Sequence, residues 1–361
     1  MIDRQLLFNR LTTFRRKIKD LQIDAALITK RENYMYLSGF TGSSANLIIT
    51  EKNAYLLTDF RYIEQSTMQA PLFEIVQHKP NIIDTIYEII TSEDVKKLGF
   101  ENQSASYASY KSFVDKLANT ELVGIGSIVE DLRSIKDTQE IETISKAVQI
   151  ADGAFLHVLP LIKPGITELD IAAELEYKMK KLGASGASFE TIVASGLRSS
   201  MCHGVASDKR LEMGDTITMD FGAMYNHYCS DITRTVFLGQ PDNKLIDIYS
   251  IVLNAQLTSE EGAKRGLTGK EVDKIARDII CQNGYEGKFG HGLGHGVGLE
   301  IHENPRLSLG GDKILENNMA VTIEPGIYVE GLGGVRIEDT IIIKDDNPVV
   351  LTKSKKDLII L

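Results

Sequence analysis

Apolar residues near the start of the chain recur at three- and four-residue steps: Leu7, Leu11, Phe14, Ile18 and Leu21. This spacing places them on one face and predicts an amphipathic opening helix. Short apolar runs of strand length follow at 25–29, 46–50 and 54–59. Helical patterns then alternate with short apolar runs up to about residue 125. The alternation predicts a small α/β domain.

Helical periodicity resumes after a junction segment, GSIVEDLRSIKD (126–137). Three residue pairs beyond the junction have the spacing of a capping box: Asp137 with Glu140, Thr167 with Asp170, and Thr268 with Glu271. Apolar stripes follow the first two pairs, and two further helices are expected at 243–264 and 269–283. A chain of 361 residues exceeds the usual size of one compact core. We therefore expect two domains, at 1–126 and 127–361.

Two pairs of strand-like runs in the second domain each carry one acid on each arm. The paired runs are 216–222 with 229–238, and 320–329 with 333–343. The acids are Asp220 and Asp231 in the first pair, and Glu324 and Glu338 in the second. Both pairs predict antiparallel hairpins. Their similarity indicates two structurally related halves.

These four carboxylates lie among apolar strand residues, where an unpaired charge is costly. Several such acids repel one another unless cations lie between them. Carboxylates combined with imidazole suit Mn, Co, Zn or Fe. The alternative for each acid is an ion pair with a nearby arginine, such as Arg234 or Arg336.

A glycine-rich stretch, GHGLGHGVGLEIHE (290–303), contributes three histidines: His291, His295 and His302. His291 and His295 would share one face of a helix, but the interleaved glycines argue against a helix. We expect a close-packed loop or strand in which the glycines let the backbone approach a site. Strand parity places Arg336 on the same side as Glu338. There it would orient a carboxylate, hold the acids in place, or form a structural ion pair.

A nucleophilic pair of Cys202 with the adjacent His203 is disfavoured, because neighbouring residues seldom face each other. The net charge of −10 argues against nucleic-acid and anionic membrane partners. Three cysteines without a CxxC motif fit a reducing compartment. The charged N-terminus lacks the apolar region of a signal peptide, and no apolar run approaches the ~20 residues of a membrane span. We therefore expect a cytoplasmic protein.

Five ordered blocks resemble those of the Xaa-Pro peptidases, prolidase and aminopeptidase P: IVASGLRSSMCHGVAS (192–207), MDFGAMYNHYCSDITRT (219–235), HGLGHGVGLEIHE (291–303), TIEPGIY (322–328) and GVRIEDT (334–340). These families share the pita-bread fold with methionine aminopeptidase and creatinase. The resemblance implies an α+β pita-bread catalytic domain with a curved antiparallel sheet. A creatinase-like α/β domain would precede it.

The resemblance also implies five metal ligands: Asp220, Asp231, His295, Glu324 and Glu338. It further implies substrate-side histidines at His203, His291 and His302, and an arginine near the metals at Arg336. Two divalent ions are expected, with manganese preferred and cobalt or zinc as options. Cys202 departs from the family pattern, because a proline often precedes the first of these histidines.

The resulting hypothesis is a metal-dependent exopeptidase that hydrolyses the Xaa-Pro bond in dipeptides or at peptide N-termini. A hydroxide bridging two metals would attack, Glu324 would transfer the proton, and His291 or His302 would stabilise the oxyanion. His203 and Arg336 would position the substrate. Proline specificity and a homodimer rest on the resemblance alone. Prolidase and aminopeptidase P both stay open, and the alternative from another class is a non-catalytic peptide-binding protein.

Overall fold

The computed structural model describes residues 2–361. The chain forms two compact units, Met1–Arg133 and Ser134–Leu361. Within the described residues, none of the helices combines the length and the apolar character that a membrane span requires.

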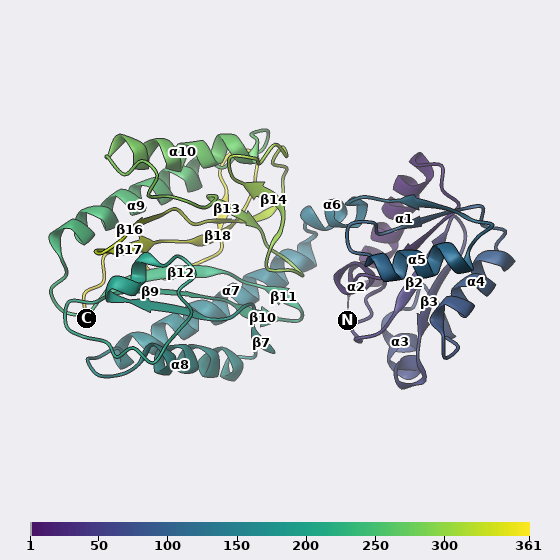
Figure 1. Cartoon of the computed structure of the whole chain (residues 1–361), viewed down its shortest axis with the longest axis horizontal. Coiled ribbons are helices and arrows are strands. Elements are labelled where there is room, and N and C mark those ends of the chain that lie inside the picture. Colours follow the sequence, from purple (N-terminus) through teal and green to yellow (C-terminus); the bar gives the residue numbers. More distant parts are fainter. Residues whose placement is uncertain (1) are drawn as a thin grey trace. The chain divides into compact units, whose positions relative to one another are not determined.

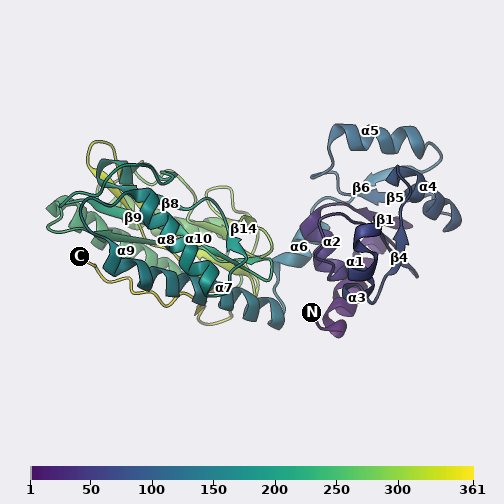
Figure 2. The ribbon, with the colours of Figure 1, turned by 90° about the horizontal axis from the view of Figure 1, so that it is seen from below.

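The first unit is built on a mixed six-stranded sheet in the order β4-β3-β2-β1-β5-β6. Its strands are β1 (Ala25–Ile28), β2 (Asn46–Thr50), β3 (Ala54–Thr58), β4 (Glu74–Gln77), β5 (Lys97–Phe100) and β6 (Glu121–Gly124). Its helices are α1 (Arg4–Asp20), α2 (Arg31–Ser38), α3 (Ile63–Gln69), α4 (Ile82–Ser92) and α5 (Tyr107–Lys116), with α6 (Ile128–Ser134) at the division. Figure 2 shows α5 on one side of this sheet and α1 and α2 on the other. The predicted α/β class of the N-terminal part is confirmed.

The opening helix buries the apolar stripe that the sequence indicates: Leu7, Leu11, Phe14 and Ile18. Asp3 caps its first turn through its side chain. The prediction was wrong at Leu21, which lies one residue past the helix and is 44% exposed. Its backbone N–H closes the last turn instead.

The second unit contains two helix pairs and a set of antiparallel strands. The helices are α7 (Thr138–Val158), α8 (Glu168–Lys181), α9 (Asn243–Gly262) and α10 (Gly269–Gln282). The strands of the first half are β7 (Gly186–Ala187), β8 (Ile192–Ser195), β9 (Thr216–Phe221), β10 (Ala223–Tyr225), β11 (Tyr228–Cys229) and β12 (Ile232–Phe237). Those of the second half are β13 (Gly294–Gly296), β14 (Glu303–Leu307), β15 (Ala320–Ile323), β16 (Gly326–Val329), β17 (Gly333–Arg336), β18 (Asp339–Ile342) and β19 (Val349–Val350).

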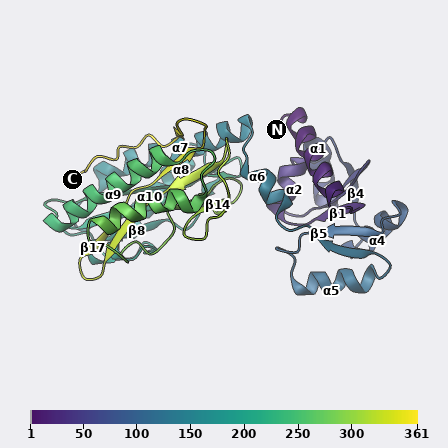
Figure 3. The same cartoon turned by 90° about the horizontal axis from the view of Figure 1, so that it is seen from above.

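Each helix pair packs on the strands of its own half and forms a separate core. One core joins α7 and α8 to β8, β9 and β12, and the other joins α9 and α10 to β14, β15, β16, β17 and β18. Figure 1 shows the strands between the two helix pairs, and Figure 3 shows α9 and α10 from the opposite direction to Figure 2. The arrangement agrees with two structurally related halves.

The three predicted capping boxes are present, with both reciprocal hydrogen bonds in each: Asp137 with Glu140, Thr167 with Asp170, and Thr268 with Glu271. They start α7, α8 and α10. The capping boxes marked where these three helices begin, and the apolar periodicity marked their buried faces.

The sequence predicts two continuous acid-bearing hairpins, but each of them is divided in two. In the first, β9 pairs with β12 and β10 pairs with β11; in the second, β15 pairs with β18 and β16 pairs with β17. Gly222 lies at the first break, where a Cβ would approach Ser230 O to 1.9 Å. Pro325 lies at the second break and has no N–H to donate to a partner strand. Each hairpin therefore bends where its acids are located.

Candidate metal centre

The two halves meet at β12 and β18, where Glu338 N donates to Thr233 O at 3.1 Å. A cavity of about 440 Å³ lies at this junction. All the predicted site residues line it: His203, Asp220, Asp231, His291, His295, His302, Glu324, Arg336 and Glu338. The fold thus brings together residues from all five of the sequence blocks.

The bends in the hairpins aim the four acids into this cavity. Asp220 is the penultimate residue of β9, and Asp231 directly precedes β12. Glu324 directly follows β15, and Glu338 directly precedes β18. The side chains of Asp231 and Glu338 are almost completely buried.

His295 lies in the middle of β13, as the strand alternative predicted, and not on a helix. A Cβ at Gly294 would lie 2.0 Å from Thr322 O, so only glycine permits this close approach to β15. The Nδ1 atom of His295 contacts Gly296 O at 3.0 Å. A carbonyl only accepts, so Nδ1 carries the proton and Nε2 presents a lone pair to the cavity.

That lone pair faces carboxylate oxygens rather than donors. Nε2 of His295 lies 3.6 Å from Asp231 Oδ2 and 3.4 Å from Glu324 Oε1. One ligand atom each from Asp231, His295 and Glu338 lie within 4.8 Å of one another. This donor set and spacing suit a divalent cation.

Buried carboxylate oxygens without partners provide an independent test of the fit. Asp220 Oδ1, Asp231 Oδ1 and Glu338 Oε1 are buried and accept no hydrogen bond in the described part of the chain. Among residues 2–361, no other carboxylate oxygen is both buried and without a partner, and all three residues line the same cavity. Buried polar atoms normally have partners. A cation is the partner that would satisfy three acceptors at once.

Without a cation, the cavity shifts its own titrating groups. Burial, followed by the neighbouring carboxylates, raises the pKa of Asp231 and of Glu338 well above the usual range. Burial raises the pKa of Glu324 to about 8. Burial and the nearby His302 lower the pKa of His295 to about 3, so this imidazole is neutral. Metals bind neutral imidazole and ionised carboxylates, so a cation would displace the protons that burial favours on these acids.

Arg336 pairs with one of the four acids. Its Nη2 donates to Asp220 Oδ2 at 2.6 Å, and its Nε donates to Thr233 Oγ1 at 3.0 Å. The arginine alternative therefore holds for Asp220 alone, since Arg234 pairs with Asp339 instead. This ion pair agrees with two of the roles considered for Arg336, holding an acid of the cavity in place and forming a structural ion pair.

Tyr328 connects Arg336 to His291, and sequence reasoning missed it. Its hydroxyl accepts from Arg336 Nη1 at 2.8 Å and lies 2.9 Å from His291 Nε2. His291 Nδ1 contacts Gly292 O at 2.8 Å, so Nδ1 is the protonated nitrogen and Nε2 accepts from Tyr328. The sequence feature that could have pointed to Tyr328 is the nearby glycines. A Cβ at Gly326 or Gly334 would collide with the tyrosine side chain.

The loop that carries His291 is held from α10. Asp273 accepts from Leu293 N at 3.0 Å and from both Nε and Nη2 of Arg277. Arg277 in turn donates to the carbonyl oxygens of Phe289 and His291. Asp273 and Arg277 are spaced i,i+4 on one helix and fix the approach to β13.

The remaining cavity residues lie nearer to solvent. His302 stacks edge-on against His295, with ring centroids 4.4 Å apart, and His203 is exposed. Cys202 lines the cavity, but no hydrogen bond joins it to the His203 ring among residues 2–361. Arg306 also lines the cavity, is exposed, and is the cross-strand neighbour of His295. Sequence reasoning missed Arg306, which lies in β14 after the glycine-rich block.

Comparison with known proteins agrees with this geometry. Residues 142–345 match Metallopeptidase family M24, and residues 10–135 match the Creatinase/Prolidase N-terminal domain. The chain belongs to metallopeptidase family M24. This M24 chain is 44% identical over 337 residues to the Xaa-Pro dipeptidase of Pyrococcus furiosus, covering 93% of this chain and 95% of that protein.

Two solved structures resemble the M24 chain over almost its whole length. The Xaa-Pro dipeptidase from Bacillus anthracis gives a TM-score of 0.96 at 48% identity, covering 98% of this chain and 100% of that chain. The X-Pro aminopeptidase from Thermotoga maritima MSB8 gives 0.91 at 40% identity, covering 97% and 99%. The Xaa-Pro peptidase family and the pita-bread fold predicted from the sequence are thereby confirmed.

Proposed function

We propose that this protein is a two-metal Xaa-Pro dipeptidase. The observation that carries the proposal is the convergence of the His295 lone pair with three unpartnered, buried carboxylate oxygens in one cavity. The dipeptidase activity is taken from the names of the relatives at 44% and 48% identity.

Five side chains would hold the cations: Asp220, Asp231, His295, Glu324 and Glu338. Two divalent ions there would lower the pKa of a water between them and polarise the carbonyl of the scissile bond. A set of four carboxylates and one imidazole favours manganese, with cobalt or zinc as options.

Glu324 is the residue of this cavity that we propose takes the proton from the attacking water. Thr322 donates to Glu324 Oε1 at 3.2 Å, which leaves Oε2 available to accept. The proton then passes from Glu324 to the leaving proline nitrogen, which must gain a proton to depart.

His302 is our candidate donor to the oxyanion that develops on the carbonyl oxygen. Both ring nitrogens of His291 are already engaged, with Gly292 O and the Tyr328 hydroxyl. The His302 ring contacts the His295 ring and forms no side-chain hydrogen bond among residues 2–361, so it can turn toward a substrate. We assign His291 and Arg336 to holding the cavity walls and His203 to the substrate side.

Arg306 favours a dipeptide over a longer peptide. A dipeptide that ends in proline places its negative carboxylate beside the scissile bond. The Arg306 side chain lines the cavity and makes no hydrogen bond or ion pair with the residues described. A solvent-facing guanidinium suits bidentate recognition of such a carboxylate.

Aminopeptidase P activity is the second candidate, because the similar Thermotoga maritima structure is an X-Pro aminopeptidase. The test compares Ala-Pro, Ala-Pro-amide and Ala-Pro-Ala as substrates of chelator-stripped protein reloaded with Mn²⁺. A dipeptidase cleaves Ala-Pro with the highest kcat/KM and requires the metal. Faster cleavage of Ala-Pro-Ala would support the aminopeptidase, and no cleavage of any of the three would support a peptide-binding protein.

A further inference from the structure

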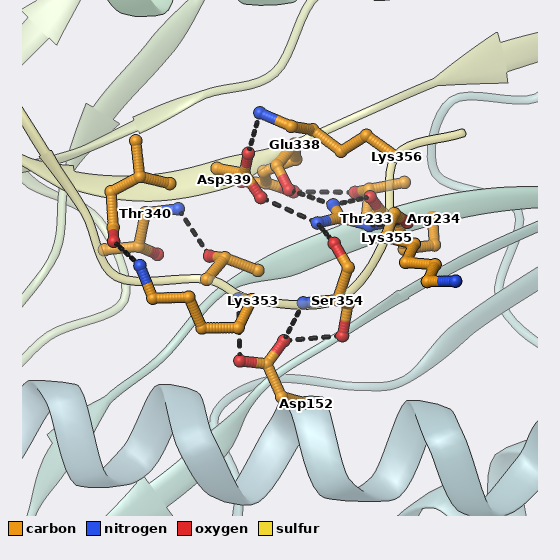
Figure 4. A network of polar contacts seen from close by, with 12 residues as sticks. Asp152, Thr233, Arg234, Glu338, Asp339, Thr340, Lys353, Ser354, Lys355 and Lys356 are labelled. Atoms are coloured by element: carbon orange, nitrogen blue, oxygen red, sulfur yellow. Dashed lines mark hydrogen bonds and ion pairs between the residues drawn. The ribbon is translucent and has the colours of Figure 1, made fainter.

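A cluster of buried charges lies behind the candidate metal centre. Arg234 and Asp339 are adjacent in sequence to Thr233 and Glu338, but their side chains point away from the cavity, as strand alternation requires. Figure 4 shows them meeting Lys356 and the segment Lys353–Lys356. The Arg234 and Asp339 side chains are almost fully buried and pair at 2.7 Å.

Arg234 uses all five of its N–H donors. Nη1 donates to the carbonyl oxygens of Thr233 and Glu338. Nη2 donates to Asp339 Oδ1 and to Ser354 O, each at 2.7 Å, and Nε donates to Lys355 O at 3.1 Å. The guanidinium therefore joins three parts of the chain: β12, the residues Glu338 and Asp339 where β18 begins, and the C-terminal segment.

Lys356 completes the cluster from the C-terminal segment. Its Nζ lies 2.6 Å from Asp339 Oδ2, 2.8 Å from Glu260 Oε2 and 3.1 Å from Gln256 Oε1. These three contacts match the three donors of an ammonium group. Lys356 thus fixes Asp339 against α9.

The segment itself is anchored to two helices. On α7, Asp152 accepts from Lys353 N at 2.9 Å, and from Ser354 N and Oγ. On α9, the Tyr249 hydroxyl donates to Lys356 O at 3.0 Å. The position of Ser354 O, which Arg234 contacts, is therefore determined from outside the cavity (Figure 4).

The cluster reaches the cavity through the backbone of two acids. Glu338 O accepts from Arg234, Glu338 N donates to Thr233 O, and Glu338 Oε2 accepts from Thr233 Oγ1 at 2.6 Å. Asp231 O accepts from Thr340 Oγ1 at 2.9 Å, and Thr340 N donates to Thr352 Oγ1. Both acids are thus held in place by the segment Thr352–Lys356.

We propose that Arg234, Asp339 and Lys356 are positioning residues that set the cation affinity of the centre by fixing Glu338. This inference rests on the proposed function for the identity of Glu338 as a ligand. A buried ion pair is by itself weak evidence for stability, because apolar residues can replace it without loss. Holding a ligand in one geometry is what a rigid, fully bonded cluster contributes. Changes to groups that orient metal ligands typically weaken metal affinity about 10–100-fold.

The test uses two adjacent lysines. Lys356→Met removes the ammonium group from Asp339 and Glu260. Lys355→Met is the matched control, because the Lys355 side chain is exposed and points away from the cluster, and only its carbonyl contacts Arg234. Mn²⁺ affinity of chelator-stripped protein is measured by competition with a metal-binding dye. The melting temperature of the stripped protein is measured separately.

We expect Lys356→Met to bind at least one Mn²⁺ about 10-fold or more weakly, with Lys355→Met unchanged. Asp152→Asn, which loosens Ser354 from the other side, is expected to act in the same direction and decides the matter if Lys356→Met does not fold. A lower melting temperature with unchanged Mn²⁺ affinity in the folded variants overturns the positioning role and leaves the proposed function intact. Wild-type protein that takes up no Mn²⁺ overturns both, whereas wild type that binds Mn²⁺ without cleaving Xaa-Pro substrates overturns the proposed function alone.

Discussion

The Nε2 atom of His295 lies 3.4 Å from Oε1 of Glu324. In the metal-loaded state that we propose, Nε2 is unprotonated and Glu324 is ionised, so neither atom can donate a hydrogen bond to the other. In that proposed state both atoms would serve as electron-pair donors to a bound ion. Without the ion, burial raises the pKa of Glu324, so this carboxyl group keeps its proton in the stripped protein.

Cation removal is expected to make stability fall with rising pH. The pKa of Glu324 is raised from 4.5 to about 8 by burial. The folded, stripped protein then keeps a proton that the unfolded chain releases, so stability is lost as pH rises toward 8. Each such proton changes stability by about 1.4 kcal/mol per pH unit.

The clean window for this measurement is pH 6.5 to 8. The lowered pKa values of His295 and His291 act with the opposite sign, but only below the ordinary histidine value of 6.5. Differential scanning calorimetry of chelator-treated protein should show a lower melting temperature at pH 8 than at pH 6.5, and added Mn²⁺ should remove most of the difference. A melting temperature that rises across this window in stripped protein would contradict the expectation.

Glu324→Gln is expected to lower kcat by about 100-fold or more, because general acid–base catalysis contributes about 10²–10⁴-fold. The amide keeps the shape of the side chain and loses the proton acceptor. Steady-state hydrolysis of Ala-Pro at saturating Mn²⁺ measures the effect. Glu330→Gln, at an exposed position of the β16–β17 turn, is the control for the chemical change. Unchanged kcat in Glu324→Gln would rule out its role in proton transfer.

Arg306→Met should raise the KM for Ala-Pro by about 10-fold or more, since hydrogen bonds to charged groups contribute about 1.5–3 kcal/mol. The KM for Ala-Pro-amide, which lacks the carboxylate, should change little. Arg265→Met removes an exposed arginine that pairs with Asp345 on the surface and serves as the control. An equal increase in KM for Ala-Pro and Ala-Pro-amide would show that Arg306 does not bind the carboxylate.

Tyr328→Phe is expected to destabilise the protein by about 1–3 kcal/mol, because His291 Nε2 loses its donor inside the cavity. Arg336 also loses one acceptor and holds Asp220 less firmly. The stability measured by chemical denaturation and the kcat for Ala-Pro should both fall. Tyr177→Phe, on the exposed side of α8, should alter neither value. An unchanged kcat in Tyr328→Phe would show that the reaction does not require the Tyr328 hydroxyl.

Local signals in the sequence located the helices and strands because they act over a few residues. The capping boxes at Asp137, Thr167 and Thr268 fix helix starts through bonds only three residues long. Short apolar runs, which are equally local, predicted β1, β2 and β3. The hairpin breaks were missed, because the apolar pattern continues across both positions. It does not show that Gly222 lies against Ser230 O or that Pro325 lacks an N–H for the partner strand.

The cavity residues found from sequence were those whose type is unusual for their surroundings. A carboxylate such as Asp220 is conspicuous within an apolar strand from the sequence alone. Tyr328 and Arg234 are not, since tyrosine is common in strands and an arginine is usually a surface residue. Their roles depend on partners more than a hundred residues away, or across the sheet, which periodicity does not encode.

The distribution of the acids over both halves has a consequence for folding kinetics. Asp220 and Asp231 belong to the first half, and Glu324 and Glu338 to the second, so a shared ion would cross-link distant parts of the chain. Contacts of such large sequence separation are expected to close late, after each helix pair has packed on its own strands. Interactions absent from the transition state affect the unfolding rate and not the folding rate. The metal-loaded protein would therefore unfold more slowly than the stripped protein, while the two would refold at the same rate.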